Sequence, residues 1–117
     1  MEDAPRSREK SELLQGTLDL LILRTLSLGP LHGYGVSQRL GQLTRGVFHV
    51  NPGTFFPALY RLEERGLVAG RWGRSENNRK ARYYSLTRAG ERRLETETRN
   101  WAQVSEAIAR VLRATEA

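Results

Sequence analysis

The sequence predicts a mainly α-helical fold with a small β-hairpin wing, that is, a winged helix-turn-helix followed by a C-terminal dimerisation helix. Apolar residues recur at helical spacing in the first half of the chain and again after residue 88. Between these parts, two short segments rich in Val, Trp and Tyr flank the polar loop GRSENNRK, as the strands of a hairpin would. We therefore expect a polar, frayed N-terminus at residues 1–12, a winged-helix domain at residues 13–87 and the dimerisation helix at residues 88–117.

The composition narrows the possible functions before any motif is considered. The chain has 117 residues, enough for one domain, and 19 basic against 13 acidic residues give a net charge of +6. Such a surplus favours a polyanionic partner, either nucleic acid or an acidic membrane surface. The absence of Cys excludes disulfides, thiolate catalysis and thiolate zinc sites, and it suits a reducing cytoplasm.

Neither a membrane span nor a signal peptide is expected. The most apolar run, residues 18–29, contains Asp19 and Arg24 and is shorter than the ~20 residues needed to cross a bilayer. The first dozen residues are charged throughout, unlike a signal peptide.

The first helix is expected to be buried on more than one side, because its apolar residues cover nearly its whole circumference. Gly29 and Pro30 end it, and residues 32–35 (HGYG) lead into a second helix. A β-prone segment follows at residues 47–50. The apolar residues that define the two helices are Leu14, Leu18, Leu21, Thr25 and Leu28 on one stripe of the first, Leu20 and Leu23 elsewhere on it, and Val36, Leu40 and Leu43 in the second.

A third helix is expected to begin at Asn51 and Pro52. The Asn side chain can accept a hydrogen bond from a first-turn amide, and Pro at the first helical position lacks only an N–H that has no partner there. Pro57 removes a helical hydrogen bond, so either Gly53 absorbs a distortion or the regular helix begins later. The inner face should hold Phe55, Ala58, Leu59 and Leu62, and the outer arc Phe56, Pro57, Tyr60, Arg61 and Glu64, with Thr54 at its flank.

The two aromatic residues on the outer arc have two interpretations. Either a neighbouring element or a second subunit covers Phe56 and Tyr60, or their rings lie against a DNA backbone and thymine methyl groups. Periodicity does not decide between the two.

The hairpin after this helix concentrates the positive charge of the chain. Gly66 is a candidate left-handed cap, and residues 67–72 and 81–86 are the expected strands. From Arg71 to Arg93 there are eight basic residues and two acidic ones. In isolation such a cluster is a solvated face, but beside a recognition helix its side chains can reach the minor groove or the phosphates.

The last helix, capped by Thr87 and running to about Leu112, predicts a second subunit. Its apolar residues recur at intervals of seven, three, four and three, the register of a helix that buries one seam against a partner. The same helix of a second copy is the expected partner, which would place two recognition helices about 34 Å apart. The expected interface consists of Leu14 and Leu18 from the first helix and Leu94, Trp101, Val104, Ile108 and Val111 from the last.

Four motifs, in this order, resemble the PadR family of bacterial transcriptional regulators. They are HGYG, GTFFPALYRLEERGL, WG and YYSLTRAG, and the similarity extends over residues 14–112, strongest to a short branch labelled the acidobacterial type. The resemblance implies a winged-helix homodimer that represses transcription and releases its operator DNA when it binds a small molecule, often a phenolic acid or a planar aromatic compound. It also implies that residues 51–65 enter the major groove, that residues 73–80 form the wing and that the last helix builds the dimer.

The resemblance assigns individual residues to DNA. The DNA-facing positions of the recognition helix are matched by Thr54, Phe56 and either Tyr60 or Arg61. The basic positions of the wing are matched by Arg79 and Lys80. The chain departs from the family at Phe56, where Tyr is usual, so a hydroxyl able to bond a phosphate is missing. Tyr34 suits a phosphate contact and a packing role about equally. The candidate DNA-binding residues are Tyr34, Asn51, Thr54, Phe56, Pro57, Tyr60, Arg61, Arg74, Asn78, Arg79 and Lys80.

Trp101 also has two interpretations. In multidrug-sensing relatives a Trp at the matching position, followed three positions later by an apolar residue as here by Val104, stacks against planar ligands between the subunits. An indole offers the flat apolar face that such a ligand needs. A Trp on a dimer seam is also a good interface anchor, and this simpler interpretation is the one we favour.

Other functional classes find less support. His32 and His49 lie seventeen residues apart without an acidic residue at metal-ligand spacing, and Glu63 and Glu64 point in different directions, so no enzyme, cofactor or metal site is expected. The alternative is a winged helix that binds a protein partner or RNA. A protein-interaction module would not need its positive charge beside the recognition helix, whereas competition between duplex DNA and RNA would identify an RNA-binding one.

Overall fold

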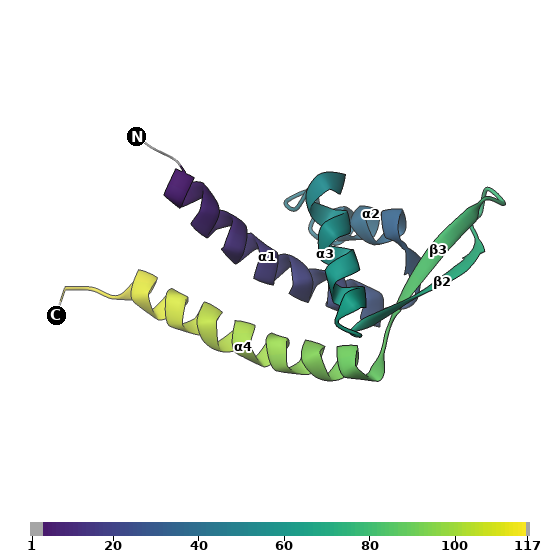
Figure 1. The fold of residues 1–117 in the computed structure, drawn as a ribbon. Helices are drawn as coiled ribbons and strands as arrows, with labels where there is room; N and C mark the ends of the chain where they lie inside the picture. The colour runs from purple at the N-terminus through teal and green to yellow at the C-terminus, as the bar shows by residue number, and fades with distance from the viewer. Residues whose placement is uncertain (1–3, 117) are drawn as a thin grey trace.

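Residues 4–116 are described by the computed structural model, with side chains described from residue 16 onward. Helix α1 lies between α4 on one side and the α2–α3 pair on the other, and the β2–β3 hairpin projects away from both termini (Figure 1). The expected polar N-terminus is helical from Ala4 onward, and its division from the domain at residue 12 stays a prediction. The elements, in chain order, are α1 (Ala4–Ser27), β1 (Leu31–His32), α2 (Gly33–Leu43), α3 (Pro52–Glu64), β2 (Val68–Arg74), β3 (Lys80–Leu86) and α4 (Arg88–Arg113).

The core forms where α1, α2 and α3 meet the sheet. Ile22, Leu23 and Thr25 are all buried although they point in different directions around α1, which confirms that this helix is covered on more than one side. The buried Thr25 hydroxyl donates to the Leu21 carbonyl at 2.8 Å, so it is not left unpaired. The inner face predicted for α3 is buried in full, and the apolar core consists of Leu18, Ile22, Leu23, Leu26, Val36, Leu40, Phe55, Ala58, Leu59, Leu62, Leu67, Val68 and Tyr84.

Two leucines of the predicted stripes lie outside the core. Leu28 and Leu43 are each 52% exposed. Helix α1 has already ended at Ser27, and α2 ends at Leu43 itself, so both side chains sit where the helix leaves the packed layer.

One strand of the sheet was not predicted. Residues 31–32 form β1, which pairs antiparallel with β3, so the strand order is β1-β3-β2. The segment predicted as β-prone, residues 47–50, forms no strand, and that prediction was wrong. Arg45 and Gly46 turn the chain with φ angles of 53° and 81°. The Phe48 N–H then donates to the Thr44 hydroxyl at 3.1 Å, so this segment bonds locally instead of joining the sheet.

Helix α3 begins as predicted. The Asn51 side-chain oxygen accepts from the Thr54 N–H at 3.1 Å, and Pro52 is the first helical residue. The later start that Pro57 suggested is therefore excluded. Pro57 lies inside the helix, where it leaves the Gly53 carbonyl without the usual i+4 donor.

The ends of α3 and the start of α4 also follow the predicted chemistry. Gly66 has a φ of 76°, and the Leu67 N–H donates to the Leu62 carbonyl at 3.0 Å, the 6→1 bond of a Schellman cap. The Thr87 hydroxyl accepts from the Gly90 N–H at 3.0 Å and starts α4. These caps fix where the hairpin leaves α3 and where it enters α4.

Candidate nucleic-acid interface

The hairpin and α3 meet on one side of the sheet. In β2, Val68, Gly70 and Trp72 alternate onto one face, and the buried Val68 shows that this face is turned toward the helices. On β3, Arg82 lies opposite Trp72 and forms an ion pair with Glu63 of α3. This ion pair links the hairpin to α3.

Most of the outer arc of α3 is open to solvent. Thr54, Pro57 and Tyr60 are exposed, and so is Tyr34 at the start of α2. Asn51 is exposed too, but its side-chain oxygen is engaged in the cap, which leaves its NH₂ group as the donor that could reach a ligand.

Phe56 is covered by a neighbouring element, which is one of the two interpretations made from the sequence. Its ring lies 5.2 Å from that of Phe55 and 5.9 Å from that of Tyr60, centroid to centroid, and it is partly buried. It packs over the start of α2, where a Cβ added at Gly33 would lie 2.7 Å from its Cε1. Tyr60 stays open, so it is the better placed of the two aromatic residues to touch DNA, and a DNA contact by Phe56 stays a prediction.

Arg61 turns back toward α1 instead of outward. Its guanidinium pairs with the Asp19 carboxylate at 3.3 Å. Burial raises the pKa of Asp19, and the positive charge of Arg61 opposes that rise. The pair fastens α3 to α1, so Arg61 has a positioning role here, and its direct contact with DNA stays a prediction.

The tip of the hairpin is a tight turn at residues 75–79. The Ser75 N–H donates to the Arg79 carbonyl at 2.9 Å, and Asn78 has a φ of 60°. Strand pairing extends to Arg74 and Lys80, so the loop is shorter than the predicted residues 73–80. The candidates at this tip, Arg74, Asn78, Arg79 and Lys80, are all exposed.

The two histidines have separate surroundings. His32 Nδ1 accepts from the Gly35 N–H at 2.9 Å and so caps α2, while its ring meets Tyr83 edge-on at 5.6 Å. His49 is exposed. Among the side chains of residues 16–116 no group of three or more His, Cys, Asp or Glu is arranged to hold a metal ion. No helix in this part of the chain has the length and hydropathy to cross a bilayer.

The apolar seam of α4 is exposed along most of its length. Trp101 is 50% exposed, Val104 and Ile108 are similar, and Val111 is still more open. Leu94 is the exception, because it packs partly against the core. Of the interface residues expected from the first helix, Leu18 lies in the core of its own chain, and the side chain of Leu14 lies outside the described residues.

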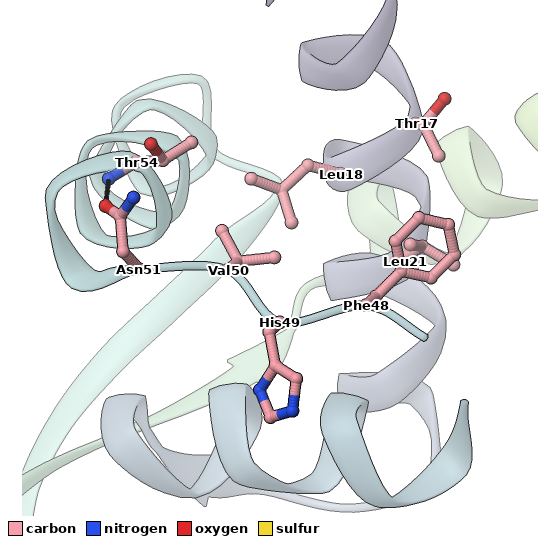
Figure 2. A pocket seen from close by; sticks show the side chains of 8 residues that line it. All are labelled: Thr17, Leu18, Leu21, Phe48, His49, Val50, Asn51 and Thr54. Carbon is pink, nitrogen blue, oxygen red and sulfur yellow. Dashed lines mark hydrogen bonds between the residues drawn. The ribbon is translucent and has the colours of Figure 1, made fainter. Parts of the chain in front are cut away.

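Two of the hollows beside α1 lie close to the candidate site or to the apolar residues of α4. A groove of about 820 Å³ lies between α1 and α4, and a pocket of about 220 Å³ lies under the start of α3. Figure 2 shows Leu18 and Val50 facing one another across the smaller pocket, with the hydrogen bond of the Asn51 cap at its edge. Both hollows are lined by Thr17, Leu21 and Phe48; the groove is further lined by Leu20, Arg24, Glu91, Leu94, Glu95, Thr98, Arg99 and Trp101.

Sequence reasoning did not assign Trp72, Arg82 or the Asp19 carboxylate to the site. The alternation of β2 was a usable signal for Trp72, because it places this residue on the same face as the apolar Val68. No local sequence pattern predicts the ion pair of Asp19 with Arg61, because the two residues are 42 positions apart in the chain.

A helix-turn-helix with an exposed recognition helix and a basic hairpin held beside it defines the winged-helix class of DNA-binding proteins. The model of the transcriptional regulator PadR-like family matches residues 22–96. The chain belongs to this family, whose members regulate transcription and are not enzymes.

Individual relatives extend the similarity over most of the chain. An uncharacterized protein X of Lysinibacillus sphaericus is 29% identical over 99 residues, which cover 85% of this chain and 91% of that protein. An uncharacterized 37.1 kDa protein in transposon TN4556 of Streptomyces fradiae is 35% identical over 86 residues, covering 74% of this chain and 23% of that protein.

Solved structures of PadR proteins have the same fold. The PadR-like transcriptional regulator of Bacillus cereus strain ATCC 14579 has a TM-score of 0.77 at 28% identity, covering 89% of this chain and 99% of that one. The PadR family regulator of Eggerthella lenta DSM 2243 has a TM-score of 0.76 at 27% identity, covering 97% and 96%. With this coverage, the likeness extends over the winged helix and α4 alike.

Proposed function

We propose that the protein is a cytoplasmic transcriptional repressor that binds a pseudo-palindromic operator as a homodimer. The observation that carries the proposal is one short chain with an exposed outer arc on α3 beside a basic hairpin, and with an exposed apolar seam on α4. A second copy on the seam would supply a second recognition helix. Two such helices about 34 Å apart fit successive major-groove turns of a two-fold operator.

Phosphate contacts supply most of the affinity in this proposal. Arg74, Arg79 and Lys80 are exposed on the hairpin, and each phosphate that a cation neutralises adds close to one unit to the log–log slope of affinity against salt. Replacing Arg79 and Lys80 together by Ala should weaken binding to all duplexes alike and lower the slope by about two. A loss confined to the operator would contradict the phosphate assignment, and a salt-independent affinity would contradict the electrostatic part altogether.

Transcription in vitro tests the repressor assignment. The template is the DNA upstream of the protein's own gene and of its neighbours. We expect a protected inverted repeat in footprinting and less transcript as protein is added. A rise in transcript would identify an activator, and absence of protection would favour the protein-interaction alternative. Equal competition by duplex RNA would favour an RNA-binding module.

A small planar aromatic or phenolic effector forms the second part of the proposal. It is supported by the groove between α1 and α4, whose lining includes Trp101, because an indole can stack against a planar aromatic ligand. A ligand in this groove would act on the relation between two copies and hence on the spacing of their recognition helices. In a Trp72→Phe variant, Trp101 is the remaining tryptophan, and its fluorescence should be quenched by planar aromatic compounds that also release the operator. An unresponsive spectrum across a varied panel would leave Trp101 as an interface anchor.

A further inference from the structure

Trp72 is a large aromatic side chain that the fold leaves open. It lies in the middle of β2 and is 61% exposed. By strand alternation it shares a face with Val68, which packs toward the helices, so the indole lies on the α3 side of the hairpin, between α3 and the hairpin tip. Arg82, which lies opposite Trp72, pairs with Glu63 of α3, so the indole lies next to the helix that is proposed to enter the major groove.

The indole is flanked by cations that restrict its orientation. Lys80 Nζ lies 5.0 Å and Arg82 Cζ 5.9 Å from the centre of the Trp72 ring, both within the range of a cation–π contact. Arg82 is itself fixed by its ion pair with Glu63 of α3. A Cβ at Gly70 would clash with Arg82 Nε, so a glycine at this position leaves the room in which the guanidinium lies.

The chemistry of this cluster fits a nucleic-acid backbone. An indole offers an apolar face that can pack on a deoxyribose, and its N–H is a donor only, which suits a phosphate oxygen. Lys80 beside it supplies the charge for the adjoining phosphate. The negative charge of Glu63 is already compensated by Arg82, so the cluster presents a net positive surface.

We propose that Trp72 is a DNA-backbone contact, with its indole packed on the strand that borders the major groove occupied by α3 and Lys80 on the adjoining phosphate. Arg82 is a positioning residue, because it links the indole to α3 through Glu63. The inference rests on DNA binding by α3 and adds a residue to it. It predicts that the contact is indifferent to sequence.

Two single-tryptophan variants test this directly. Trp101→Phe leaves Trp72 as the remaining tryptophan, and Trp72→Phe leaves Trp101, which makes the second chain a matched control. Each is titrated with a labelled random-sequence duplex of about three helical turns at low salt, and acrylamide quenching is measured with and without saturating DNA. We expect DNA to lower the quenching constant of Trp72 several-fold and to leave that of Trp101 unchanged. Equal accessibility of Trp72 in free and bound protein, or equal protection of both tryptophans, would overturn the proposal.

Affinity measurements distinguish the contribution of the Trp72 side chain to DNA binding from that of the neighbouring charged side chains. Trp72→Ala should weaken binding about tenfold, as expected for truncating one well-packed interface residue, and should leave the salt slope unchanged. Lys80→Ala should lower that slope by about one. Leu112→Ala, an exposed apolar truncation near the end of α4, is the control and should leave the affinity unchanged. An affinity unchanged by Trp72→Ala would overturn the inference, whereas no binding of DNA by the unaltered chain would instead overturn the proposed function.

Discussion

Helices α3 and α4 carry apolar stripes of the same kind, but the chain covers only one of them. The stripe of α3 is buried against α1, α2 and the sheet, with Phe55 and Leu59 inaccessible to solvent. The stripe of α4 is half open at Trp101 and Ile108. Helical spacing therefore tells which residues share a face, whereas the partner of that face depends on what the rest of the chain can reach.

The same two helices differ in how firmly they are held. Ion pairs tie α3 to α1 through Arg61 and Asp19, and to the hairpin through Glu63 and Arg82. Along α4, the ion pairs that the structure records join residues of α4 itself, such as Arg93 with Glu97 at 3.7 Å. Helix α3 is thus linked to two other elements of the chain by ion pairs, whereas α4 keeps an exposed apolar face, on which we propose that a second copy binds.

The largest effect on stability should come from truncating a side chain in the buried apolar stripe of α3. Phe55→Ala removes a fully buried ring from α3, and we expect a loss of about 3–5 kcal/mol in the free energy of unfolding. Urea unfolding followed by circular dichroism measures it. Ile108→Ala, on the open stripe, is the control and should change the stability of the separated chain by less than about 0.5 kcal/mol. Equal losses would show that the two stripes are covered to the same extent.

A charge on the open stripe should break the pairing of chains. We expect Ile108→Glu to weaken the dimer about 30-fold or more, because it buries an unpaired carboxylate at the interface centre, while the far-ultraviolet spectrum stays unchanged. Sedimentation equilibrium measures the dissociation constant. Gln103→Glu adds the same charge at another exposed position of α4 and should leave the dimer intact. If the Ile108→Glu variant still forms the dimer, the open apolar stripe of α4 is not the dimer interface.

The cap of α3 offers a smaller and separable effect. Asn51→Ala removes the acceptor for the Thr54 N–H and should cost about 1 kcal/mol of stability in thermal unfolding. Asn51→Asp keeps an acceptor and places a negative charge at a helix N-terminus, so its stability should be preserved. Its affinity for DNA should nevertheless fall, because the carboxylate faces phosphates. If Asn51→Asp binds DNA as well as the unaltered chain, the start of α3 does not approach the backbone.

The smallest effect concerns the ion pair that fastens α3 to α1. Burial raises the pKa of Asp19 in the folded chain despite the neighbouring Arg61. A raised pKa means that the folded state favours the protonated carboxyl, so this contribution to stability is present below about pH 4 and is lost as the pH rises through the raised pKa. Stability of the unaltered chain relative to Asp19→Asn should therefore fall as the pH increases across this range. A difference between the two chains that grows with pH would contradict the assigned direction.

The local chemistry of the chain was predictable because it depends on neighbours in sequence. Asn51, Gly66 and Thr87 mark the helix ends they were expected to mark, since a cap needs only an acceptor or a left-handed backbone at the right offset. The inner face of α3 was predictable for the same reason. The family was predictable because its motifs are themselves local.

What the sequence did not predict involves contacts between distant segments. Residues 31–32 have no strand pattern of their own and become β1 only because β3 lies alongside them. Residues 47–50 have the composition of a strand, but they pair with neither edge strand of the β1-β3-β2 sheet. Phe56 and Arg61 share the outer arc of α3 on a helical wheel, yet Phe56 packs over α2 and Arg61 over α1. A helical wheel gives the direction of each side chain from the helix axis, but it does not show which other elements lie close enough to contact that side chain.

The sequence by itself determined the order of the four helices and of the hairpin, the caps at Asn51, Gly66 and Thr87, the basic hairpin and the family, because periodicity, cap chemistry and local charge act over a few residues. The tertiary structure decided which of the outward residues of α3 are open, which cations surround Trp72 and which apolar stripe is left exposed. These depend on packing and ion pairing between segments tens of residues apart. The residues against which a side chain packs are those that the fold places next to it, and these are known only from the folded structure.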